Sequence, residues 1–190
     1  MARRRGTVLL FPGAGASRDQ PTLVAIEAGV APLWDTVRAD FPYRTAGRRA
    51  PDRPPVLMAA VRDELVAIRT RRVVAGGRSM GGRIASMVAA GADGSPPPTK
   101  VAGLVLIAYP LHPPGKPDRL RVDHLPDLHM PCLFVHGTKD PFGAPEELER
   151  WTATIPGLVT QHWIDGRGHD LKGRDPEVVA IVRDWLPSIP

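Results

Sequence analysis

Short apolar runs alternate along the chain with longer segments in which apolar residues recur every three or four positions. The run TVLLF at 7–11 is apolar at consecutive positions, which is typical of a strand buried on both faces of a sheet. Residues 54–68 instead place Leu57, Val61 and Leu65 on one face, which is helical spacing. Strands are expected at 7–11, 36–41, 73–75, 104–108, 132–136 and 159–164.

Helical segments are expected between these strands. The helix that contains Leu23 and Ile26 is predicted to stop at Gly29. One further helix is expected to begin directly after Ser79 and to run to residue 89, and the others are expected at 54–68, 145–154 and 176–186. Residues 44–55 and the Pro-rich connector 111–130 are expected to be irregular. Apolar strands that alternate with helices predict an α/β fold, with a mostly parallel sheet of about six strands and helices on both faces. No repeat or second unit is evident, so we expect a single domain over 1–190.

Composition is ordinary for a soluble globular protein, with 43% hydrophobic and 24% charged residues. The net charge of +5 would by itself suggest nucleic acid, but the basic residues are spread along the chain and are not interleaved with aromatics. We expect no nucleic-acid partner. The apolar run after the basic N-terminus is too short for a signal peptide, and no stretch is long enough to span a bilayer. A cytoplasmic protein that does not bind membranes is therefore expected.

The strongest chemical signal is the sequence Gly77-Arg78-Ser79-Met80-Gly81, which matches G-x-S-x-G. It follows an apolar strand and begins a buried helix, which is the context of a nucleophile elbow. The glycines at 77 and 81 are expected to prevent side chains from colliding with the strained serine backbone. We predict that Ser79 is a nucleophile. The alternative is a plain strand-to-helix turn in which serine caps the helix.

A serine nucleophile needs a base, and in this arrangement the chain order is Ser, then Asp or Glu, then His. Asp140 follows the expected strand 132–136 and lies where ligands bind in open α/β sheets. His169 follows the last strand in a glycine-flanked loop, whereas His136 and His162 fall within or at the end of strands. We therefore predict a Ser79-Asp140-His169 triad. A loop-capping aspartate and an unrelated surface histidine are the alternatives.

An oxyanion hole needs two backbone N–H donors. We expect one from Met80, directly after the nucleophile, and the other from Ala14 in the loop Pro12-Gly13-Ala14-Gly15. Pro12 has no N–H and cannot serve. No cofactor and no metal are expected, because the histidines lack paired ligand spacing and no phosphate-binding loop is present. Cys132, the single cysteine, is expected to be a small buried apolar residue.

The chain resembles the small bacterial α/β-hydrolases of the dienelactone-hydrolase-like branch. It is also similar to the hydrolase-like domain of a subunit of the non-specific-lethal acetyltransferase complex. The resemblance rests on PGAGAS, FPYR, PDRPPVL, GRSMGGR, YPLHPPGKP and HGTKDPFG, at 12–17, 41–44, 51–57, 77–83, 109–117 and 136–143. It implies the α/β-hydrolase fold and the nucleophile, acid and base roles of Ser79, Asp140 and His169. Two departures stand out: Pro12 replaces the usual first-loop histidine, and dienelactone hydrolases proper use a cysteine nucleophile.

These observations predict a serine hydrolase that cleaves a small carboxylic ester or thioester through an acyl-enzyme. A peptidase or amidase is the alternative among enzymes. A non-catalytic interaction module on the same scaffold is the alternative from another class, although such a module would not need all three triad residues. The short connector is too proline-rich for a helical lid, so an open site and small acyl groups are expected. We also consider that Arg121 or His124 in the connector approaches the mouth of the active site, where it would favour an acidic substrate. The oligomeric state is left open.

Overall fold

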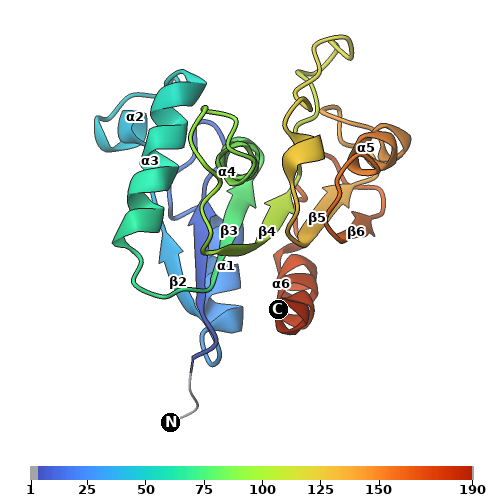
Figure 1. The fold of residues 1–190 in the computed structure, drawn as a ribbon. Helices are drawn as coiled ribbons and strands as arrows, with labels where there is room; N and C mark the ends of the chain where they lie inside the picture. Colours follow the sequence, from blue (N-terminus) through green and yellow to red (C-terminus); the bar gives the residue numbers. More distant parts are fainter. Residues whose placement is uncertain (1–3, 190) are drawn as a thin grey trace.

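A computed structural model describes residues 4–189 and shows one six-stranded sheet in the order β2-β1-β3-β4-β5-β6. Every neighbouring pair of strands is parallel. The expected α/β-hydrolase fold class is thus confirmed (Figure 1). The strands are β1 (Thr7–Phe11), β2 (Asp35–Arg38), β3 (Val73–Arg78), β4 (Val101–Ile107), β5 (Cys132–Gly137) and β6 (Val159–Ile164).

Helices cover both faces of the sheet (Figure 1). They are α1 (Pro21–Val30), α2 (Pro42–Thr45), α3 (Pro54–Ala67), α4 (Met80–Ala89), α5 (Pro145–Thr152) and α6 (Asp175–Trp185). Apolar residues of α1 and α6 pack with one set of strand side chains, and those of α3, α4 and α5 pack with the other. Because alternate strand residues point to opposite faces, consecutive apolar residues are what this double burial requires.

Two expectations about the first third of the chain are wrong. Gly29 does not stop α1, which continues to Val30. A Cβ at Gly29 would collide with Val179 of α6, so this glycine allows two helices to pack closely. The second strand ends at Arg38 instead of continuing to residue 41, and Pro42 then begins the short helix α2.

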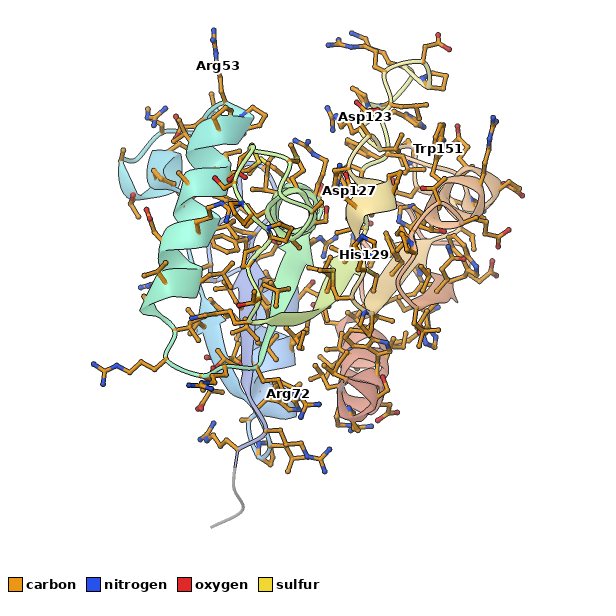
Figure 2. The ribbon with its side chains drawn as sticks, viewed as in Figure 1. Arg53, Arg72, Asp123, Asp127, His129 and Trp151 are labelled. Atoms are coloured by element: carbon orange, nitrogen blue, oxygen red, sulfur yellow. The ribbon has the colours of Figure 1, made fainter. Side chains whose placement is uncertain are left out.

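The connector between β4 and β5 contains one 3-10 turn, η1 (Leu125–Asp127), as its only regular element. In Figure 1 this connector extends beyond the carboxyl ends of the strands. Figure 2 shows Asp123 and Asp127 on the connector, whereas Arg72, just before β3, lies at the opposite end of the sheet. Among residues 4–189, no helix is long and apolar enough to cross a membrane.

Candidate active site

Ser79 occupies a strained turn between β3 and α4. Its φ is 49° and its ψ is −117°, a conformation that L-residues rarely adopt. Glycine is needed at 77 and 81 because of the neighbouring strand. A Cβ at either position would collide with the backbone of Phe11 in β1. The two glycines therefore allow the turn to pack against the neighbouring strand, which presents Ser79 at the carboxyl edge of the sheet.

The structure brings Ser79, Asp140 and His169 together from three separate loops. His169 Nε2 lies 2.7 Å from Ser79 Oγ, and His169 Nδ1 lies 2.8 Å from Asp140 Oδ2. A carboxylate only accepts hydrogen bonds, so Nδ1 carries the proton and Nε2 is free to accept from the serine hydroxyl. Asp140 is only 4% exposed, and its other oxygen accepts the N–H of Phe142 at 2.9 Å. The carboxylate is therefore fixed in position from both sides.

The other histidines occupy different environments. His136 lies inside β5, and its Nε2–H donates to the carbonyl of Gly143 at 3.0 Å. Burial lowers the pKa of His136, and its Nε2 lies 3.5 Å from Asp140 Oδ2, farther than the 2.8 Å of His169 Nδ1. His162 lies on β6 and is exposed. His112 Nε2 lies 3.4 Å from Glu147 Oε2, and His129 is exposed.

In the loop after β1, the backbone N–H groups of residues 13–15 differ in whether they have a protein acceptor. The N–H of Gly13 donates to Gln20 Oε1 at 3.1 Å, and the N–H of Gly15 donates to the Tyr43 hydroxyl at 3.3 Å. Between them, the N–H of Ala14 has no acceptor among residues 4–189. Met80 begins α4, where the first N–H groups of a helix have no intrahelical partner. Ala14 and Met80 both line the pocket in front of Ser79.

Two residues that support the site were not identified from the sequence. Arg78 is buried between β3 and the His169 loop, where its guanidinium donates to Thr22 Oγ1 at 2.8 Å and to the His169 carbonyl at 2.9 Å. Burial lowers the pKa of Arg78 below its ordinary value. Phe142 stacks on the His169 ring with a centroid separation of 4.0 Å. Arg78 is a variable position of the G-x-S-x-G motif, and Phe142 lies two residues after Asp140 in HGTKDPFG. A sequence pattern carries little information about the role of a residue at such a position.

A pocket of about 510 Å³ lies in front of Ser79. Its lining includes His169, Phe142, Pro110 and two further arginines, Arg83 of α4 and Arg121 of the connector. Of the two connector residues considered near the mouth, Arg121 therefore lies at the pocket. His124 instead lines a second, adjoining pocket, and its Nε2 lies 2.8 Å from the buried Ser86 hydroxyl. Among residues 4–189 no cluster of three or more potential metal ligands occurs.

Residues 4–179 match the family described as an alpha/beta hydrolase domain, and the chain belongs to this family. Solved structures share the fold. Est1E from Butyrivibrio proteoclasticus, with ferulic acid bound, gives a TM-score of 0.78 at 14% identity over 98% of this chain and 90% of that one. Dienelactone hydrolase from Anabaena variabilis gives a TM-score of 0.76 at 20% identity, over 98% of this chain and 87% of that one. The type II thioesterase BorB of the borrelidin biosynthetic cluster gives a TM-score of 0.70 at 18% identity, over 95% of this chain and 92% of that one.

Proposed function

We propose that the protein is a cofactor-free serine hydrolase that cleaves a small carboxylic ester or thioester. The observation that carries the proposal is the continuous hydrogen-bonded row from Ser79 through His169 to Asp140, with distances of 2.7 and 2.8 Å. The row begins at a strained serine in an open pocket. Membership of the α/β-hydrolase family supports the reaction class, and its structural neighbours include a dienelactone hydrolase and a thioesterase.

In the proposed reaction, Ser79 Oγ attacks the carbonyl carbon while His169 Nε2 takes the hydroxyl proton. The tetrahedral intermediate collapses as the same imidazolium protonates the departing alkoxide or thiolate, which leaves an acyl group on Ser79. Water then attacks this acyl group with His169 again as base, and the carboxylic acid is released. Asp140 orients His169 and stabilises the imidazolium. The N–H groups of Ala14 and Met80 bind the developing oxyanion.

The competing proposal is a non-catalytic interaction module. It rests on the sequence resemblance to a subunit of the non-specific-lethal complex. A module that only binds partners has no use for a strained serine hydrogen-bonded to a fixed imidazole, because a residue held at positive φ costs of the order of 1–3 kcal/mol. The geometry therefore favours the hydrolase, and one experiment separates the two proposals.

Ser79→Ala tests the proposed function by steady-state hydrolysis of p-nitrophenyl acetate and butyrate. The substitution should lower kcat/KM on the order of 10⁴-fold or more and leave the circular dichroism spectrum unchanged. Ser188→Ala is the control, because Ser188 is exposed and donates only to a local carbonyl. An unmodified protein without esterase activity, or a Ser79→Ala protein that keeps most of it, would refute the assignment.

A further inference from the structure

Two arginines in the wall of the candidate active site have no carboxylate partner. Arg83 lies one helical turn after Ser79 on α4, and Arg121 lies on the connector. Neither guanidinium lies within 4.0 Å of a carboxylate oxygen of residues 4–189. Arginine is costly to bury unless its charge and its five N–H donors are matched by acceptors. Neither half-buried guanidinium therefore has an anionic acceptor among residues 4–189.

Of the two arginines, Arg83 has the poorer set of hydrogen-bond acceptors. Its Nη1–H donates to the thioether sulfur of Met87 at 3.2 Å, which is a weak acceptor. Its Nε is buried and has no hydrogen-bond partner among the described residues. Burial is the main cause that lowers the pKa of Arg83, and the positive charge of Arg121 lowers it further. Both arginines line the pocket in front of Ser79 and the pocket that adjoins it.

The titratable groups buried beside the pair carry no negative charge. His124, which adjoins Arg83, has its pKa lowered to about 4 by burial and is neutral at pH 7. Burial raises the pKa of Tyr109 to about 12, so its phenol is neutral as well. Asp170 is the only carboxylate among the residues that line the pocket in front of Ser79, against three arginines. Asp123 and Asp127 lie at exposed positions on the connector (Figure 2) and line the adjoining pocket together with both arginines, but neither carboxylate forms an ion pair with them.

We propose that the substrate is an ester or thioester with an anionic group, a carboxylate or a phosphate, which Arg83 and Arg121 bind. The inference rests on the proposed function. Arg83 lies four positions after Ser79, a helical rise of about 6 Å, and both residues line the pocket in front of the nucleophile. The anionic group therefore lies a few bonds from the scissile carbonyl. Two guanidinium groups suit such a group because they can donate several charge-assisted hydrogen bonds to it.

The test compares three ethyl esters of similar shape by pH-stat at pH 7.5: monoethyl glutarate, its uncharged carboxamide analogue, and ethyl 4-phosphonobutanoate. The unmodified protein should have a kcat/KM at least about tenfold higher for an anionic ester than for the carboxamide. A larger preference for the phosphonate would indicate a phosphate group in the natural substrate. A larger preference for the glutarate would indicate a carboxylate. A carboxamide hydrolysed as well as both anionic esters would overturn the inference.

Arg83→Gln and Arg121→Gln should each reduce this ratio to near one. Arg119→Gln is the matched control, because Arg119 is an exposed arginine on the same connector that does not line the pocket. A thermal unfolding curve for each variant identifies any loss of fold, and Arg121→Gln changes only the irregular connector. If both glutamine variants keep the preference of the unmodified protein, the two arginines do not bind the anion.

Binding to Ser79→Ala separates this inference from the proposed function. Isothermal titration calorimetry should show that this variant binds monoethyl glutarate more tightly than the carboxamide analogue, by about tenfold. If that preference holds while the unmodified protein hydrolyses no ester, the anion site stands and the hydrolase proposal fails. If the carboxamide is hydrolysed and neither titration nor kinetics favours an anion, the hydrolase proposal stands and the anion site fails.

Discussion

At the scale of single residues, the site depends on side chains that hold His169 in place. Asp140 fixes the imidazole through Nδ1, Phe142 stacks on the ring, and Arg78 holds the loop by its backbone carbonyl. Thr22, which accepts from Arg78, in turn donates to Asp175 at 2.6 Å. The histidine is thus positioned by contacts that reach both α1 and α6.

Arg78→Lys should lower kcat and change KM much less. Lysine keeps the charge but cannot donate to Thr22 and to the His169 carbonyl together, so the imidazole loses its position relative to Ser79. Small misplacements of this kind cost up to about 10²-fold in rate, and we expect a loss of about 10- to 100-fold in kcat. Steady-state kinetics checks this, with Arg71→Lys at an exposed site as control. An unchanged kcat would show that Arg78 has no part in positioning His169.

Buried His124 should make the fold sensitive to acid. Its pKa in the folded protein is about 4, below the ordinary 6.5, so the unfolded state binds the proton more tightly. Its contribution to stability is therefore complete above pH 6.5 and is lost as the pH falls toward 4, at up to about 1.4 kcal/mol per pH unit.

Urea unfolding between pH 7 and 4.5 measures this effect. His124→Gln should be less stable than the unmodified protein at pH 7, because Ser86 and Tyr109 lose their hydrogen bonds to the imidazole, but its stability should fall less steeply with acid. His129→Gln, at an exposed site, should keep the original slope. Equal slopes for all three proteins would contradict the assignment of a neutral, buried His124.

At the scale of elements, close packing between α4 and β1 places the nucleophile. Gly77 lies next to the last residue of β3 and Gly81 is the second residue of α4, and a side chain at either position would meet the backbone of Phe11. Because backbone cannot move aside as a flexible side chain can, the approach of helix and strand depends on these two glycines. The same contact sets the distance between Ser79 and the loop that contains Ala14.

Gly81→Ala tests this packing, because the two effects of the substitution change the free energy of unfolding in opposite directions. In a helix, alanine is favoured over glycine by about 1 kcal/mol, so propensity alone predicts a more stable protein. The collision with Phe11 predicts the opposite, a loss of about 2 kcal/mol or more in the free energy of unfolding. Chemical denaturation decides between them. Gly168→Ala is the control, because its Cβ would meet only Lys139 O, at an ordinary 3.6 Å.

At the scale of the whole molecule, the pattern of the sequence predicts the sheet well and the supporting contacts poorly. Strands are recognisable because burial on both faces demands consecutive apolar residues, as at 7–11. Ser79, Asp140 and His169 could be selected because each follows a strand, and strand ends share one edge of a parallel sheet. Arg78 and Arg83 could not, because their roles depend on which distant groups surround a guanidinium, and periodicity does not encode that.

The open architecture should limit the preference for long acyl chains. The connector contains only a short 3-10 turn, and three arginines line the pocket, so a long chain would leave many methylenes in water or against charge. Each CH₂ left exposed forgoes about 0.8 kcal/mol of burial. From butyrate to palmitate p-nitrophenyl esters, kcat/KM should not rise, and no activation should appear above the micelle threshold. A steep rise along the series would refute an open site.

The most direct test of the central claim is to locate the covalent intermediate. A fluorophosphonate probe should add one label to the protein, and peptide mass spectrometry should place it on Ser79. Labelling should be absent in Ser79→Ala and much slower in His169→Ala, because the hydroxyl is activated by this imidazole. A label on another residue, or ester hydrolysis by a protein that the probe does not label, would contradict the account.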